Sequence, residues 1–391
     1  MLPVKEISKH LNAASANIFS SLYPDLNNYI YGLNESQNSR YGLTKEVTDF
    51  KTHLTNPYYR CTGGFGRDTN IFFLLAEALW ILVGRQDVKF LKFFNNRMSE
   101  FSDDGINFHA PYGFRLRNYG IASSKDDFIH SFDQVKAAIR MFENNHDDRR
   151  VVMSIWNPNL DLETTSKDIP CNDMVMLKIR NNKLVTTIAN RSNDLHWGLT
   201  TNVFQFSFIT ECMAAALGIE LGTQTHNSQS LHVYTENPIA SQLWFEYNNR
   251  KESYKDLYDL AEMRKMDFNF NMDTAVMKFN QIDTAAHIII DSLELLMKGE
   301  KPDSKDLMWL GGFSKYFTTI YSILSLYVEY KLKLTSLKDD ESKNLLKMEM
   351  IDRISQISGE KKNLDIIVLA KNFMAKRIGG KSQLLKPIGT F

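Results

Sequence analysis

The sequence predicts an α+β fold, in which a mixed sheet packs with helices and is followed by a C-terminal helical appendage. Strand-like and helix-like segments alternate between residues 70 and 234, without the regular strand–helix–strand order of a parallel sheet. Two alternating apolar runs, 174–180 and 184–190, flank Asn181-Asn182-Lys183, as in a β-hairpin. Long helical patterns dominate after residue 275. We therefore divide the chain into residues 1–274, the α+β domain, and residues 275–391, the appendage.

Each element has its own signal. Residues 70–97 carry apolar residues at helical spacing and are interrupted near Gly84, which predicts one helix or two. Residues 101–121 contain Gly105, Pro111, Gly113 and Gly120, which predicts loop or short strand. The remaining patterns predict helices over 131–144, 202–217, 275–299, 314–335 and 340–377, and strands over 149–156 and 229–234.

Composition excludes several classes of protein. Among 391 residues, 43% are hydrophobic, enough to bury a large core. Lys+Arg and Asp+Glu are 46 each, so the net charge is +0 and a general electrostatic grip on nucleic acid is not expected. The three cysteines have neither a disulfide nor a metal-ligand pattern, so we expect no metal. Without an apolar span or signal segment, we expect a cytoplasmic protein that does not contact membranes.

The most specific signal is a series of short motifs in a fixed order. IPCN (169–172) contains Cys171, and NRSNDLHWGLTTN (190–202) follows, with Arg191 twenty residues after Cys171. LHVY (231–234) follows, while Arg149-Arg150 stands upstream. In this order and spacing the motifs resemble the thymidylate synthase family, which includes the deoxypyrimidine nucleotide hydroxymethylases. The resemblance extends back through Tyr112-Gly113, Glu77 in AEALW and Arg40 in SRYGLT, and covers about residues 38–240 but not the appendage.

The resemblance implies a thymidylate-synthase-like mixed sheet in a catalytic domain and a covalent mechanism. The Cys171 thiolate would add to C6 of a uracil nucleotide and make C5 nucleophilic. We expect neighbouring arginines to lower the pKa of this thiol. C5 would then attack the one-carbon unit of 5,10-methylenetetrahydrofolate, the cosubstrate. Glu77 and Tyr112 would move protons.

The same resemblance assigns binding roles. Paired guanidinium groups suit a phosphate because they are always charged and bidentate. In a homodimer, Arg149 and Arg150 would reach the phosphate site of the other subunit. The other implied contacts are the phosphate with Arg40, Arg191 and Ser192; the base with Asn202; the sugar with His232 and Tyr234; and folate with Asp194, Gly198, Arg67 and Trp156.

Three positions indicate which base and which product. The amide of Asn202 matches O4 and N3–H of uracil, whereas cytosine-specific relatives typically carry Asp there. Asn172 stands where thymidylate synthases have His. Met98 and Phe101 align with the Trp pair that shields the reactive methylene from water. We therefore expect a dUMP hydroxymethylase that forms 5-hydroxymethyl-dUMP, an enzyme type of phages with modified DNA.

Alternatives remain open at this stage. Thymidylate synthase itself is the next candidate, followed by a dCMP hydroxymethylase, and then by a nucleotide-binding scaffold whose helical tail recruits a partner. Cys171 before a strand also suits inert packing, and Arg149-Arg150 suits a charged strand end. The apolar faces of the appendage must cover the core, extend the dimer or bind a partner. The end KPIGTF (386–391) is similar to the family's C-terminal segment that closes over folate.

Overall fold

The computed structural model describes residues 30, 32–33, 36–39, 42–58, 60–61, 69–120, 131–238, 241, 277–357 and 365–378. Arg40, Arg67 and the end 386–391 lie outside the described residues. The elements follow the predicted α+β class: a seven-stranded mixed sheet is packed with helices, and the chain ends in a helical region. The fold-class prediction is therefore confirmed.

The sheet has the strand order β1-β2-β7-β5-β4-β3, with β6 paired to β7. Strand β7 runs parallel to β5 and β6 and antiparallel to β2, and the remaining neighbours are antiparallel. The strands are β1 (Gln37–Ser39), β2 (Gly42–Leu54), β3 (Val152–Ser154), β4 (Asn172–Arg180), β5 (Lys183–Asn190), β6 (Asn193–Asp194) and β7 (Glu220–Tyr234).

The predicted hairpin joins β4 to β5 through a two-residue turn. Asn181 and Asn182 have φ of 51° and 56°, both in the left-handed region. Asparagine tolerates this region better than other non-glycine residues, and a turn of this hand matches the twist of the two strands. Two strands were less visible in the sequence: β7 is much longer than predicted, and β2 was not predicted. Both contain polar residues on buried positions, which masks the alternation of a half-buried strand.

The interruption near Gly84 separates α3 (Ile71–Leu82) from α4 (Val88–Phe94), as predicted. Predicted helices also form as α6 (Gln134–Asn144) and α8 (Gly198–Leu217). The prediction of loop or short strand over residues 101–121 was wrong, because this segment includes the short helix α5 (Tyr112–Arg117). Gly113 permits that helix, since a Cβ at this position would lie 2.5 Å from the Cα of Ile81 in α3. Two further one-turn elements are η1 (Asn96–Glu100) and α7 (Pro158–Asp161).

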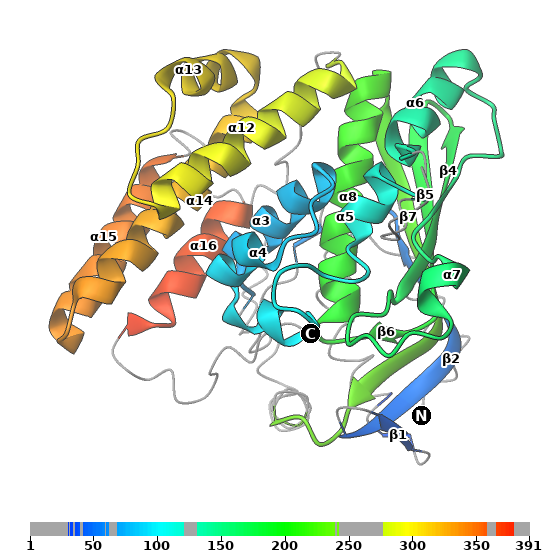
Figure 1. Ribbon diagram of the computed structural model, residues 1–391, viewed down its shortest axis with the longest axis horizontal. Helices are drawn as coiled ribbons and strands as arrows, with labels where there is room; N and C mark the ends of the chain where they lie inside the picture. The colour runs from blue at the N-terminus through cyan, green and yellow to red at the C-terminus, as the bar shows by residue number, and fades with distance from the viewer. Residues whose placement is uncertain are drawn as a thin grey trace.

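Figure 1 shows the layers: the sheet lies along one side, α8 covers its inner face, and α3 and α4 come next. The C-terminal helices form the side away from the sheet. They are α12 (Phe279–Met297), α13 (Ser304–Phe313), α14 (Lys315–Ser336), α15 (Asp340–Ile357) and α16 (Asp365–Ala375). Within the described part of the chain, α12, α14 and α16 pack on α3, and α12 also packs on α8.

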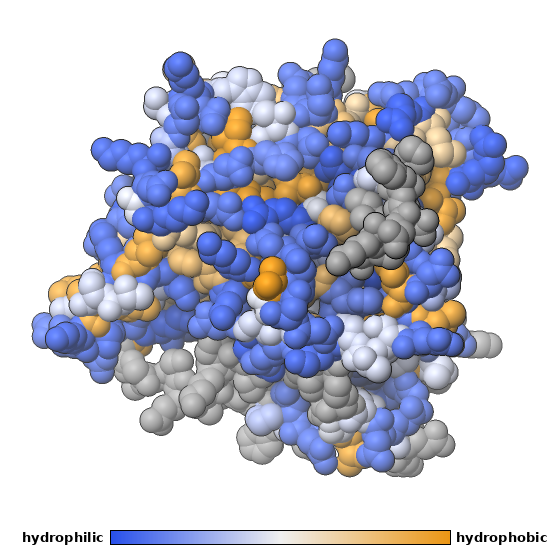
Figure 2. All heavy atoms as spheres, in the orientation of Figure 1, coloured by the Kyte–Doolittle hydropathy of each residue, from blue (hydrophilic) through white to orange (hydrophobic). Residues whose placement is uncertain are grey.

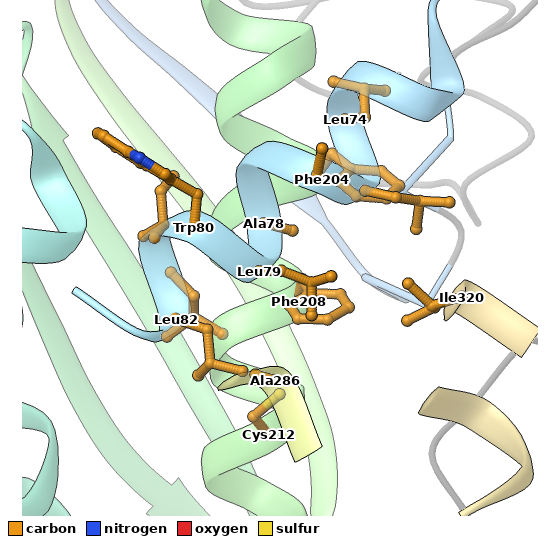
Figure 3. Close-up of a cluster of buried hydrophobic side chains, with 14 of the residues drawn as sticks. Leu74, Ala78, Leu79, Trp80, Leu82, Phe204, Phe208, Cys212, Ala286 and Ile320 are labelled. Carbon is orange, nitrogen blue, oxygen red and sulfur yellow. The ribbon is translucent and has the colours of Figure 1, made fainter. Parts of the chain in front are cut away.

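The appendage shares one hydrophobic core with the α+β domain. Phe208 and Cys212 of α8 point toward Leu79, Ala286 and Ile320, which come from α3, α12 and α14 (Figure 3). Each fully buried Leu, Ile or Phe side chain contributes about 1.5–3 kcal/mol to folding stability. The apolar faces of the appendage therefore cover the core, one of the three alternatives left open by the sequence.

Ion pairs also join the appendage to the domain. Arg117 of α5 pairs with Asp283 of α12 through two bonds of 2.9 Å. Arg85 pairs with Glu294 of the same helix at 2.7 Å. Because both pairs are partly buried, they fix the orientation of α12 against α3 and α5 more than exposed pairs would.

The face shown in Figure 2 is mainly hydrophilic, with apolar atoms gathered near the edge where Figure 1 places β4. Among the described residues, Val152 of β3 and Met174 of β4 are exposed apolar side chains of this sheet. None of the described helices has the length and apolar character needed to cross a bilayer.

Candidate active site

A cavity of about 240 Å³ opens between α3, the start of α8, the end of β7 and the segment that leads into β4. It brings together side chains that are more than 150 residues apart in sequence. Its lining includes most of the residues predicted from the motifs, namely Glu77, Tyr112, Cys171, Ser192, Asp194, Gly198, Asn202, His232 and Tyr234. Met98 and Phe101, the expected replacements for the Trp pair, line it as well.

Cys171 is held directly before β4. Its carbonyl accepts a hydrogen bond from the Arg191 N–H at 3.1 Å, and the Arg191 guanidinium donates to the Pro170 carbonyl at 2.8 Å. One guanidinium nitrogen of Arg191 lies 3.8 Å from the Cys171 Sγ. This geometry places a fixed positive charge beside the sulfur.

The expected lowering of the Cys171 pKa is wrong for this structure. Burial raises the pKa of the thiol, and the opposing effect of Arg191 is smaller. The carboxylates of Asp168, Asp173 and Asp194 raise it further. A single guanidinium does not compensate for a thiolate removed from water among three acidic groups, so the thiol is protonated near neutral pH.

Glu77 projects from α3, which is otherwise apolar around it. The side-chain amide of Gln205, on α8, donates to Glu77 Oε2 at 2.6 Å. Burial raises the Glu77 pKa to about 7, and the Gln205 bond offsets only part of this. A carboxyl group with this pKa both accepts and releases a proton at neutral pH, as a general acid–base group requires.

Tyr112 begins α5 and is oriented toward the nucleophile. The Cys171 N–H donates to the Tyr112 hydroxyl over 3.4 Å, and the Tyr112 ring stacks on Phe206 of α8 with centroids 6.2 Å apart. Burial raises the pKa of Tyr112, and the Cys171 and Asp168 charges add to the effect. The hydroxyl therefore keeps its proton near neutral pH and can act as a hydrogen-bond donor.

Asp194 caps the start of α8. Its Oδ2 accepts hydrogen bonds from the N–H groups of Trp197 (2.6 Å) and Gly198 (3.2 Å), while its buried Oδ1 has no partner among the described residues. Burial raises the Asp194 pKa, against the effect of His232. An unpaired buried acceptor on a cavity wall suits a ligand with an N–H donor.

The base-reading candidate Asn202 lies one turn into α8. Its side-chain amide donates to Asn193 Oδ1 over 3.5 Å, and the Asn193 amide donates to Ser228 Oγ at 3.2 Å. Gly198 leaves room for this arrangement, because a Cβ there would lie 3.2 Å from Asn193 Oδ1. The Asn202 amide is thus buried and oriented before any ligand is considered.

His232 and Tyr234 both lie on β7 and face the cavity, with ring centroids 5.2 Å apart. Burial lowers the pKa of His232, although Asp194 acts in the opposite direction. The imidazole is therefore neutral at pH 7 and able to both donate and accept a hydrogen bond. A pair of this kind suits a sugar hydroxyl.

The predicted arginines divide into two groups. Arg191 lies beside the cavity, with its guanidinium 6.0 Å from the centre of the half-buried Trp156 ring. Arg149 and Arg150 are exposed, and Arg150 pairs with Asp148 at 2.7 Å. Since Val152 pairs with Met176, these two arginines lie near the far end of β4, about 20 Å from Cys171. They cannot reach the cavity of their own chain.

Sequence reasoning missed several residues of the lining. Asp168 and Lys167 come from the loop before Cys171, Trp80 comes from α3, and Asn193 lies between the predicted residues Ser192 and Asp194. Gln205 also lines the cavity and contacts Glu77. Only Gln205 had a visible signal, because it is three residues after Asn202 and thus on the same face of a helix.

A layer of buried polar side chains lies between α8 and the sheet. Asn172 and Asn190 are hydrogen-bonded to each other, and Gln224 and His226 are in contact on β7. Thr186 and Thr52 pair in register with Gln224 and His226. Each of these six side chains has a buried polar atom without a partner among the described residues. Such groups commonly bind internal water. This part of the protein interior is therefore polar.

Comparison with known proteins gives a consistent result. Residues 66–285 match a family model described as "Thymidylate synthase". Three relatives carry the name "Deoxyuridylate hydroxymethyltransferase". The one from Bacillus phage SP01 is 38% identical over 256 residues, covering 64% of this chain and 66% of the relative. The one from Pseudomonas phage M6 is 41% identical over 173 residues (44% and 46%), and that from Delftia phage PhiW-14 is 31% identical over 207 residues (50% and 54%). The chain thus matches about half to two thirds of the length of these relatives.

Proposed function

The chain belongs to the thymidylate synthase family, and from this premise we propose that it hydroxymethylates C5 of dUMP. The product would be 5-hydroxymethyl-dUMP, formed from 5,10-methylenetetrahydrofolate and water. One observation carries the proposal: a single cavity combines Cys171, Glu77 and Asn202 with Met98 and Phe101 at the positions aligned with a shielding Trp pair. The similarity to three phage deoxyuridylate hydroxymethyltransferases supports the same reaction.

Cys171 would begin the reaction by adding to C6 of the uracil ring. Its thiol gives its proton to water in this step, since burial keeps the thiol neutral beforehand. The guanidinium of Arg191, 3.8 Å from Sγ, stabilises the negative charge that develops on sulfur. The electrons of the C5–C6 double bond move toward O4, and the amide of Asn202 donates a hydrogen bond to the ring.

Glu77 would accept the proton that C5 loses after it has bonded to the one-carbon unit supplied by the folate cosubstrate. Its pKa of about 7 suits this transfer, and the Tyr112 hydroxyl lines the same cavity and can assist by hydrogen bonding. Release of tetrahydrofolate leaves an exocyclic methylene on C5. Water then adds to the methylene, and Cys171 leaves C6 as the ring double bond re-forms.

The remaining residues would position the two substrates. Asn202 selects uracil over cytosine, and His232 with Tyr234 contacts the sugar. The unpaired Oδ1 of Asp194 would accept a hydrogen bond from the pterin ring, with Gly198 beside it. The other proposed contacts are those of the phosphate with Arg40, Arg191 and Ser192, and those of folate with Arg67 and Trp156.

We also propose that the enzyme is a homodimer in which Arg149 and Arg150 complete the phosphate site of the other subunit. Their distance of about 20 Å from Cys171 excludes a role in their own cavity, while both side chains are exposed. The exposed Val152 and Met174 on the sheet offer an apolar face for a partner copy.

A mixing experiment tests this arrangement. A variant with both Arg149→Ala and Arg150→Ala, and a second variant with Cys171→Ala, should each be inactive alone. When the two are mixed, subunit exchange should create one site with an intact nucleophile and intact arginines, and activity should return to about a quarter of wild type by statistical pairing. No recovery despite demonstrated exchange would contradict the shared site.

Mass spectrometry of the product tests the activity itself. dUMP, dCMP, UMP and CMP are each incubated with 5,10-methylenetetrahydrofolate, and we expect hydroxymethyl product only from dUMP, together with tetrahydrofolate. Thymidylate with dihydrofolate would instead identify a thymidylate synthase, and product from dCMP a cytosine enzyme. Cys171→Ala should abolish turnover; a nucleotide-binding scaffold would show no turnover with either protein.

The division of the chain also becomes a proposal. We assign the chemistry to residues 1–274 and a supporting role to residues 275–391, because α12 and α14 pack on the helix that carries Glu77. Residues 275–285, at the start of the appendage, lie within the matched family segment, and residues 286–391 lie outside it. The cytoplasmic location stays a prediction.

A further inference from the structure

One acidic group on the cavity wall has no part in the mechanism above. Asp168 stands three residues before Cys171 and lines the cavity together with Lys167. The residue is half-buried and forms part of the cavity lining. Burial raises the Asp168 pKa, so this carboxyl group holds protons more tightly than one on the surface.

The loop around Asp168 fixes its carboxylate in one orientation. The Ala110 N–H donates to Asp168 Oδ2 at 2.7 Å, and the Asp168 N–H donates to Ser166 Oγ at 3.1 Å. Ser166 in turn donates to Asp103 at 2.5 Å. Among the described residues, no side chain donates a hydrogen bond to Asp168. Oδ1 is thus the oxygen that can act on a molecule in the cavity.

The basic side chains that act on Asp168 are bonded to another carboxylate. Arg115 and His109 influence its pKa, but both are hydrogen-bonded to Asp161, at 2.8 and 3.1 Å. Asp168 is therefore a half-buried carboxylate without an ion-pair partner in the described part of the chain. A carboxylate left unpaired in a cavity is a common sign of a chemical role.

Asp168 is also close to the reacting groups. Its charge is among the causes that raise the pKa of the Cys171 thiol and of the Tyr112 hydroxyl, after burial itself. Glu77, in contrast, is on α3 and bonded to Gln205 of α8. The cavity lining thus has three carboxylates, Glu77, Asp168 and Asp194, of which Asp194 is bonded to the start of α8. Glu77 and Asp168 are then available for a reaction with two separate proton removals.

We propose that Asp168 is the general base that activates water for the hydroxymethylation step, while Glu77 serves the C5 proton. This inference rests on the proposed function, since it concerns the last stage of the same reaction. Asp168 Oδ1 accepts a proton from water as the water oxygen bonds to the exocyclic methylene. The electrons of that double bond move into the ring toward O4, then return to form C5=C6 as the bond between C6 and the Cys171 sulfur breaks. Cys171 leaves as a thiolate and recovers from solvent the proton that it gave up at the start, while the proton on Asp168 passes to solvent, so atoms and charge balance.

The proposal predicts that Asp168→Asn separates early from late steps. Asparagine keeps the size of the side chain, and its oxygen still accepts the hydrogen bond from Ala110, but it cannot take a proton from water. With dUMP tritiated at C5, tritium release in a single turnover should stay within about threefold of wild type. Steady-state formation of 5-hydroxymethyl-dUMP should fall by about 10²–10⁴-fold, the usual contribution of a general base.

A second readout distinguishes chemistry from positioning. An added thiol such as 2-mercaptoethanol needs no base at Asp168, because its thiolate can attack the methylene directly. It should restore turnover of Asp168→Asn and yield a thioether product. Glu163→Gln removes an exposed carboxylate from the same segment and should behave as wild type in all three assays.

The outcomes separate the two hypotheses. Absence of tritium release by the wild-type enzyme would overturn the proposed function itself. If the wild type releases tritium but Asp168→Asn forms hydroxymethyl product at the wild-type rate, Asp168 is not the base. If Asp168→Asn loses both tritium release and product formation, and thiol does not restore turnover, Asp168 acts in an earlier step. That outcome would overturn the inference.

Discussion

Replacement of Glu77 by Gln should make the protein more stable at alkaline pH while removing its activity. The Glu77 carboxyl group has a pKa of about 7 in the folded chain, compared with an ordinary 4.5. Folding therefore favours the protonated form, and the stabilisation that comes with the bound proton is complete below pH 4.5 and lost as the pH rises through 7. The difference corresponds to about 3 kcal/mol, at about 1.4 kcal/mol for each tenfold change in proton affinity.

Glutamine imitates the protonated carboxyl group at every pH. It stays neutral, and its side-chain oxygen can accept the hydrogen bond that Gln205 donates to Glu77 Oε2. The variant should match the wild type near pH 4 and exceed it by less than about 1 kcal/mol at pH 5. At pH 8.5 its free energy of unfolding should be higher by up to about 3 kcal/mol.

Urea unfolding of both proteins between pH 4 and 8.5 provides the measurement. The exposed Glu163→Gln serves as the control and should leave the pH profile unchanged. Single-turnover release of tritium from C5 of dUMP should fall by about 10²–10⁴-fold in Glu77→Gln. Parallel stability profiles for wild type and variant would refute the reasoning, because they would mean that water solvates this carboxylate freely.

Three further predictions follow from the site and the core. Gly113→Ala places a Cβ 2.5 Å from the Ile81 Cα, so α5 must move by about 1 Å and carry Tyr112 with it; kcat should fall by about 100-fold, and an unchanged kcat would contradict the close packing. Asn202→Asp should shift the ratio of kcat/KM toward dCMP, measured by product formation from the two nucleotides; unchanged selectivity would remove Asn202 from base reading. Phe317→Ala, at a fully buried position of α14, should lower the free energy of unfolding by about 3–5 kcal/mol; a loss below 1 kcal/mol would mean that the appendage adds little to the core.

The sequence was informative wherever the signal is local. Periodicity located α3, α4, α6 and α8, and the two asparagines at 181–182 located the hairpin, because side-chain period and turn chemistry depend only on near neighbours. The motif residues Cys171, Asn202 and Asp194 could likewise be found by their spacing. Helix α5 and strand β2 could not, because Gly113 acts through a contact with α3, and the buried polar residues of the sheet hide its alternation.

Other properties of the site depend on parts of the chain that meet only after folding. Asp168 becomes a half-buried, unpaired carboxylate because the Ala110 N–H holds it and Asp161 is bonded to the basic side chains around it. The pKa of Cys171 rises, against expectation, because the cost of burial exceeds the attraction of Arg191.

The residue types along the chain determined which chemistry is available. They supply a thiol, side-chain amides, carboxylates and arginines, in a recognisable order. Tertiary structure decided how far each group lies from water and from the others. It brought Glu77 and Gln205 together across two helices, moved Arg149 and Arg150 about 20 Å from the nucleophile, and covered α3 with the appendage. Solvation and long-range distance set proton affinity and reach, and neither is encoded in the spacing of residues along a sequence.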